Sequence, residues 1–109
     1  MRAWALTIDT SRRTSALART IAQAERSARA LSAFGVRRVV LFGSLARGSF
    51  GERSDIDLAV EGLPDGKLVA AEVVANATSA FEVSVVRVED APPHIRSAIE
   101  HEGVELWRR

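Results

Sequence analysis

Two aspartates, Asp55 and Asp57, are separated by one residue in the apolar segment 55–60. Because side chains alternate between the two faces of a β-strand, both carboxylates point to one face, while Ile56 and Leu58 point to the other. Two like charges beside an apolar run repel each other and lose hydration, and a divalent cation between them relieves this cost. The oxygen ligands, with no Cys or His in the segment, favour Mg²⁺, or else Mn²⁺, over zinc.

Glu82 is the candidate for a third carboxylate. The same alternation directs Phe81, Val83 and Val85 toward a core and Glu82 to the opposite face, so a neighbouring strand can bring this carboxylate to the aspartate pair. Three acidic groups can hold two metal ions about 4 Å apart, an arrangement used for in-line displacement at phosphorus. One metal activates the attacking hydroxyl and the other binds the leaving phosphates. We therefore expect two Mg²⁺ ions, with Glu82 completing the site.

Gly43 and Ser44 precede the aspartate pair, with ten residues between Ser44 and Asp55. They end an apolar strand and begin a helical turn, where free backbone N–H groups and a hydroxyl can bind a phosphate. Gly43 allows the backbone to approach the phosphate closely, and Ser44 can be both helix N-cap and phosphate ligand. Arg47, one turn later, either neutralises the phosphate or pairs with the acidic residues as a structural clamp.

Hydrophobic periodicity and turn residues indicate the elements that position these groups. Helices are expected over 11–34, 44–47, 67–79 and 92–102, and strands over 36–42, 55–61, 81–88 and 104–107. The last of these is a short closing strand or tail. The first two strands are joined by about twelve residues without a crossover helix, so they can be parallel or antiparallel. We expect an α/β fold in which helices flank a small mixed sheet, with a single domain over 1–109 and a catalytic core over about 36–107.

Length and composition narrow the function classes. A chain of 109 residues leaves no room for a second, acceptor-binding domain, so another chain must present any large acceptor. The absence of Cys excludes thiol chemistry and suits a cytoplasmic location, and no apolar run approaches the roughly 20 residues that span a membrane. Although Met1–Arg38 holds eight Arg and only two acidic residues, we interpret them as a solvated helix face and expect no direct nucleic-acid binding.

Gly43-Ser44, Arg47-Gly48 and the run Ser54–Val60, at this spacing, resemble the signature of the minimal nucleotidyltransferases in the DNA polymerase beta-like superfamily. The resemblance covers about Val36 to Trp107. It implies magnesium, ATP or another nucleoside triphosphate as donor, and a triphosphate bound by Gly43, Ser44, Arg47 and Ser54. It also implies that Asp55 and Asp57 are metal ligands. Where the family usually has Asp at its third acidic position, this chain has Glu82.

Minimal members of this family are commonly paired with a separate HEPN-type helical protein, as antitoxin to an RNase toxin, and some transfer AMP to a tyrosine of that partner. The resemblance thus implies an enzyme that transfers AMP or another nucleoside monophosphate to a hydroxyl of a partner protein in a hetero-oligomer. The alternative is a non-catalytic binding module that neutralises its partner by occlusion, with the helix over 11–34 as the interface. Transfer to a small molecule such as an aminoglycoside is a weaker hypothesis, because the enzymes that catalyse it carry an added helical domain.

Overall fold

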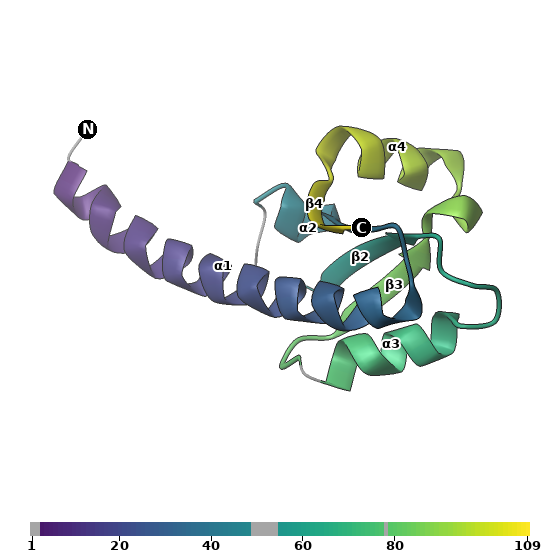
Figure 1. Cartoon of the computed structure of the whole chain (residues 1–109). Helices are drawn as coiled ribbons and strands as arrows, with labels where there is room; N and C mark the ends of the chain where they lie inside the picture. Colours follow the sequence, from purple (N-terminus) through teal and green to yellow (C-terminus); the bar gives the residue numbers. More distant parts are fainter. Residues whose placement is uncertain (1–2, 49–54, 78) are drawn as a thin grey trace.

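A computed structural model describes residues 3–48, 55–77 and 79–109, with side chains from Leu17 onward. Its strands are β1 (Arg38–Phe42), β2 (Ile56–Glu61), β3 (Val83–Arg87) and β4 (Val104–Arg108). Its α-helices are α1 (Ala3–Leu31), α2 (Gly43–Ala46), α3 (Leu68–Ala77) and α4 (Pro93–Glu102), and its 3-10 turns are η1 (Ser32–Phe34) and η2 (Val88–Asp90). Figure 1 shows α1 and α3 on one face of the sheet, α4 on the other, and the N-terminal part of α1 extending past the sheet.

The described strands form one four-stranded sheet in the order β3-β2-β1-β4. β1 is antiparallel to β2 and to β4, whereas β2 is parallel to β3. The expected mixed sheet flanked by helices is therefore confirmed, and the first two strands are antiparallel. This topology brings the end of β1 and the starts of β2 and β3 to one end of the sheet. Asp57 pairs there with Phe42 of β1 and with Ser84 of β3.

Both faces of the sheet are covered. The larger core lies between the sheet and the helices α1 and α3, and it includes the inward residues Ile56, Leu58 and Val60. A smaller core lies under α4, where Ala59 is fully buried with Val40, Phe42, Val88 and Ile99. Ala59 is on the same face as Asp57, so α4 covers this face except at the end where the aspartate lies. The site is the open end of an otherwise covered layer.

Helix α1 begins at Ala3 rather than at residue 11. No Gly or Pro precedes Gly35 in the sequence, so nothing stops the helix from continuing back through the N-cap candidates at 9–11. At the other end the chain turns as expected at Gly35, whose φ of 77° is left-handed and whose N–H donates to the Ser32 carbonyl. In the described part of the chain, no helix is long and apolar enough to cross a membrane.

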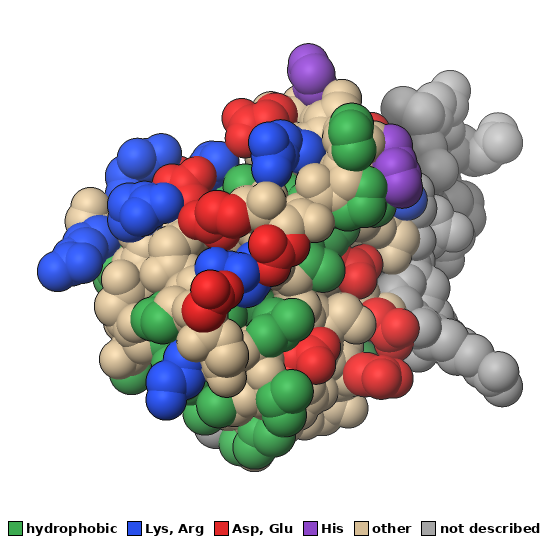
Figure 2. Space-filling model, turned by 90° about the vertical axis from the view of Figure 1, so that its right-hand side faces the viewer, with side chains coloured by type: hydrophobic (Ala, Val, Ile, Leu, Met, Phe, Trp, Pro, Cys, Tyr) green, Lys and Arg blue, Asp and Glu red, His purple; other side chains and the backbone are tan. Residues whose placement is uncertain are grey.

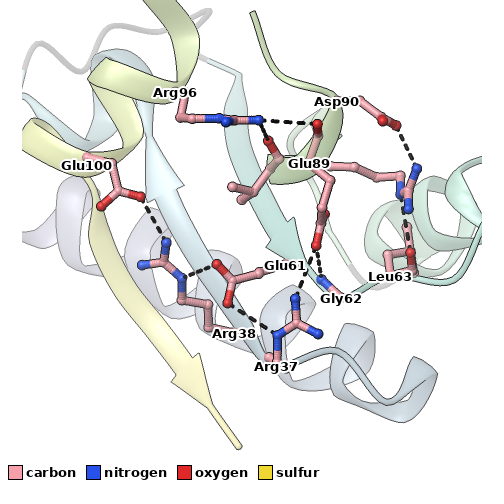
Figure 3. Close-up of polar contacts among 11 residues, drawn as sticks. Arg37, Arg38, Glu61, Gly62, Leu63, Glu89, Asp90, Arg96 and Glu100 are labelled. Carbon is pink, nitrogen blue, oxygen red and sulfur yellow. Dashed lines mark hydrogen bonds and ion pairs between the residues drawn. The ribbon is translucent and has the colours of Figure 1, made fainter. Parts of the chain in front are cut away.

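A network of ion pairs lies at the end of the sheet opposite Asp57 (Figure 3). Arg37 and Arg38 both contact Glu61, at 3.4 and 3.2 Å. Arg38 also reaches Glu100 of α4 at 3.0 Å, and Arg37 reaches Glu89 of η2 at 3.3 Å. The pairs of the exposed Arg37 contribute only about 0–1 kcal/mol each, and the network mainly orients α4 and η2 on the strands. Two of the basic residues counted in the N-terminal segment are thus structural.

Side chains from α3 complete the free edge of β3. Asn76 Nδ2 donates to the Val83 carbonyl, and Asn76 Oδ1 accepts the Val83 N–H, both at 2.8 Å. Glu72 Oε2 accepts the N–H of Val85 at 3.2 Å. Because an edge strand otherwise leaves such groups to solvent or to another chain, these bonds fix β3, and with it Ser84, in one register.

Asn76→Ala is expected to lower the free energy of unfolding by about 1–2 kcal/mol, because the Val83 N–H and C=O lose their partner. The higher helix propensity of Ala offsets about 0.5 kcal/mol of this loss. Urea unfolding followed by circular dichroism measures the net change in the free energy of unfolding. Val73→Ala is the matched control, since Val73 is 64% exposed on the same helix and its truncation is expected to change stability by less than about 0.5 kcal/mol. Equal stability of the two variants would contradict the prediction.

Candidate active site

The turn from β1 into α2 is in contact with the Asp57 carboxylate. Gly43, the first residue after β1, has a φ of 77°, a left-handed conformation that favours glycine. A Cβ at this position would overlap Asp57 Oδ2 and lie 3.1 Å from Asp57 Cγ. Gly43 is thus needed for its backbone conformation and for space. The contact places the phosphate-binding candidates and the carboxylate pair side by side.

The α2 turn presents its first residues toward this carboxylate. Phe42 is the N-cap and gives no side-chain cap bond, so Ser44 lies inside the first turn. Leu45 is buried and anchors the turn to the larger core. The first N–H groups of a helix have no partner within it, and Gly43 and Ser44 are in this position. Ser44, half-buried, lies in the turn that contacts Asp57.

The two aspartates differ in their surroundings. Asp55 is exposed just before β2, whereas Asp57 is half-buried within the strand. Burial raises the pKa of the Asp57 carboxyl, the negative charge of Asp55 raises it further, and the positive charge of Arg47 opposes them. The ionised pair is therefore held at a cost in free energy, which a bound cation relieves. Two carboxylates fit a hard cation such as Mg²⁺, which is commonly held by one or two carboxylates together with substrate phosphates.

Arg47 pairs with an acidic residue and also lies near the carboxylate pair. Its Nη1 pairs with Glu102 of α4 at 3.3 Å, and both side chains are about half exposed. Its charge also acts on Asp57, so the guanidinium lies near the carboxylate pair. An ion pair this exposed is weak. Arg47 is therefore held only weakly to Glu102.

Glu82 lies just ahead of β3, one residue before the register partner of Ile56. It is exposed, its carbonyl accepts the N–H of Ile56 at 2.9 Å, and together with Ser84 it lines a pocket of about 310 Å³ against Glu72 and Asn76 of α3. Within the described ranges, no three His, Asp or Glu side chains lie close enough to hold a metal together. The role of Glu82 as a third metal ligand stays a prediction.

Two further serines belong to the description of the site: one was predicted from the sequence and the other was not. Ser54, predicted to bind nucleotide, lies outside the described residues. Ser84, which the sequence analysis did not single out, is the register partner of Asp57 on β3. Its signal was present in the alternation of β3, which places Glu82 and Ser84 on the same face.

A pocket of about 420 Å³ opens beside Asp57. Its apolar wall includes Phe42, Val86, Ala91, Pro92 and Ile95. Arg87 and Asp90, which form an ion pair at 2.7 Å, supply polar lining. The pocket gives the carboxylates an apolar neighbour of a size that accommodates a ring system.

A mixed sheet with a glycine turn after its first strand and a carboxylate pair on the next is the arrangement of a nucleotidyltransferase fold. The sequence profile of the polymerase beta nucleotidyltransferase family matches residues 28–109. The chain belongs to this family. The part of α1 before residue 28 lies outside the match, and no curated protein sequence shows significant similarity to the chain.

Solved structures share this fold. A chain of a toxin–antitoxin structure with AMP-PNP has a TM-score of 0.67 at 22% identity, covering 78% of this chain and 73% of that one. A Sulfolobus solfataricus protein described as a nucleotidyltransferase has a TM-score of 0.58 at 20% identity, covering 89% and 87%. The complex of tri-AMPylated Shewanella oneidensis HEPN toxin with MNT antitoxin gives 0.53 at 17% identity, covering 89% and 73%. At these identities the likeness concerns the fold.

Proposed function

We propose that the chain is a magnesium-dependent nucleotidyltransferase that moves a nucleoside monophosphate, in the simplest case AMP from ATP, onto a hydroxyl of a partner protein. The observation that carries the proposal is the contact between Gly43 and the Asp57 carboxylate. It puts a turn suited to a triphosphate beside a carboxylate pair suited to a cation. Membership of the nucleotidyltransferase family supports the reaction class.

In this reaction the acceptor hydroxyl oxygen attacks the α-phosphorus, the bond from that phosphorus to the oxygen bridging the β-phosphate breaks, and pyrophosphate leaves. The hydroxyl proton passes to a nearby base or to water. Asp55 and Asp57 would hold Mg²⁺, which neutralises phosphate charge when bound. Gly43 and Ser44 would bind the triphosphate through backbone N–H groups and the hydroxyl, and Arg47 would leave Glu102 to contact the leaving phosphates. Ser54 is assigned to the nucleotide by the resemblance.

A HEPN-type helical toxin is the proposed partner. Similar folds occur in a toxin–antitoxin structure and in a complex of an AMPylated HEPN toxin with its MNT antitoxin, which supports the pairing. Two surfaces are available for such a protein. Helix α1 extends past the sheet (Figure 1), and apolar side chains gather over α3 (Figure 2), where Val69 and Val73 are 74% and 64% exposed. Exposed large apolar side chains that adjoin each other are typical of protein interfaces.

The test is transfer from ATP labelled at the α-phosphate. The protein is incubated with Mg²⁺ and the product of the neighbouring gene, and we expect label on that product together with release of pyrophosphate. Asp55→Asn is expected to reduce the transfer by about 100-fold or more, since loss of a residue that only orients a metal ligand already costs about 10–100-fold. Because Asp55 is exposed, this substitution leaves the core intact.

Asp65→Asn is the control for the removed charge, since Asp65 is 96% exposed beside Arg87 at the opposite end of the sheet. Its transfer is expected to equal that of the unchanged protein. Label on the partner that persists in Asp55→Asn, or no label with any neighbouring gene product, would reject the proposed activity.

The second candidate is neutralisation of the partner by occlusion alone. It is favoured by the position of Glu82, which leaves the aspartates without a third carboxylate among the described residues. The two candidates differ in cells that express the partner toxin. If the combined Asp55→Ala and Asp57→Ala protein still protects growth fully, occlusion is sufficient; if protection is lost while the complex still forms, transfer is required.

A further inference from the structure

The parallel ladder between β2 and β3 decides which residue of β3 faces the aspartates. Ile56 pairs with Val83, Asp57 with Ser84 and Leu58 with Val85. Partners in a parallel ladder project to the same face of the sheet. Val83 and Val85 are buried in the same core as Ile56 and Leu58, which agrees with this register. Ser84 therefore projects to the face of Asp57, one strand away.

This register is firmly held. A slip of β3 by one residue would turn Val83 and Val85 out of the core and Ser84 into it. A slip by two would bring Glu82 level with Asp57, but it would break both bonds from Asn76 to Val83 and the bond from Glu72 to Val85. Glu82 lies before the first residue of β3, so Ser84 keeps the place beside Asp57.

We infer that Ser84 occupies the position of the third metal ligand, and that the site binds one divalent cation with its nucleotide rather than two. The inference rests on the proposed function. A neutral serine hydroxyl attracts Mg²⁺ far less than a carboxylate does, whereas two carboxylates and the phosphates of a nucleotide suffice for one ion. Among the described residues, no carboxylate of β3 is level with Asp57 to hold the ion that would activate an acceptor hydroxyl. The chain is thus built to hold the donor nucleotide, and the acceptor hydroxyl must be activated by another group.

The number of bound ions tests this directly. Mn²⁺ bound in the presence of α,β-methylene-ATP, which resists transfer at the α-phosphorus, is counted from the electron paramagnetic resonance signal of free Mn²⁺. We expect one ion per chain in the unchanged protein and two in Ser84→Asp. Glu82→Gln is expected to leave the count at one, and since Glu82 is exposed this variant keeps the fold even if Ser84→Asp does not.

Two ions in the unchanged protein, falling to one in Glu82→Gln, would overturn the inference and assign the third ligand to Glu82, with the proposed function intact. A count that stays at one in a folded Ser84→Asp protein would also overturn it. No bound Mn²⁺ with nucleotide present would reject the proposed function together with the inference. The three failures are therefore distinguishable from one measurement.

Discussion

Replacing Gly43 with alanine is expected to lower the free energy of unfolding by about 2–5 kcal/mol and to abolish nucleotide binding. The left-handed φ of 77° costs about 1–2 kcal/mol for any residue with a Cβ. The new methyl group would also overlap Asp57 Oδ2, and such overpacking typically costs about 1–3 kcal/mol more. Because relief requires Asp57 or the α2 turn to move, the phosphate turn and the carboxylate pair separate. Urea unfolding and nucleotide titration measure the two effects.

Gly48→Ala is the matched control that measures the cost of the left-handed backbone alone. Gly48 has the same φ of 77°, and no atom of the described residues lies within 4 Å of a Cβ built there. We expect it to lose only about 1–2 kcal/mol. In an Asp57→Ala background the loss caused by Gly43→Ala should shrink to that of Gly48→Ala, since the overlapping atoms are gone. Equal losses at the two glycines in the unchanged background would show that the contact with Asp57 contributes nothing.

The carboxylate pair and its glycine turn were predictable because each depends on local geometry. Alternation along a strand places Asp55 and Asp57 on one face in any fold, and a glycine that follows an apolar strand already indicates a special turn. The elements themselves follow from equally local signals. Gly35, for example, ends the N-terminal helix as expected, with a left-handed φ.

The residue of β3 that lies level with Asp57 was not predictable, for the opposite reason. Alternation places Glu82 and Ser84 on one face but does not say which of them is level with Asp57. That choice depends on the register between β2 and β3, and it is fixed by long-range contacts such as the bonds from Asn76 to Val83. No local pattern encodes such a contact. A carboxylate two residues before Ser84 therefore attracts the assignment of third metal ligand, and that assignment stays a prediction.

The start of α1 was mispredicted because N-cap residues were given too much weight. Asp9, Thr10 and Ser11 favour a helix start, yet the structure runs helical from Ala3. An N-cap preference of about 1 kcal/mol cannot interrupt a segment without Gly or Pro, since each added residue gains a hydrogen bond at little cost. As a consequence, α1 extends further beyond the end of the sheet that carries Asp57 than the sequence indicated.

Asp57→Asn is expected to stabilise the metal-free protein while it destroys the site. The pKa of Asp57 is raised because burial and the charge of Asp55 disfavour its ionised form, so a neutral amide of the same shape removes an unfavourable charge. Since the carboxyl is only half-buried, solvent screening limits the gain at pH 7 to no more than about 1 kcal/mol. Magnesium-dependent nucleotide affinity is expected to fall by about 100-fold or more. Thermal unfolding without metal and nucleotide titration with Mg²⁺ measure the two changes.

The pH dependence of the stability difference between Asp57→Asn and the unchanged protein identifies the cause of that difference. Below the unfolded-state pKa of about 3.9, Asp57 is protonated in both states and costs nothing, so the two proteins are expected to be equally stable. As pH rises through the raised pKa of the folded state, the unchanged protein must ionise a disfavoured group and loses stability, whereas Asp57→Asn does not. Their difference should therefore grow with pH and then level off. A difference independent of pH would mean that packing of the amide, and not the charge, produces the gain.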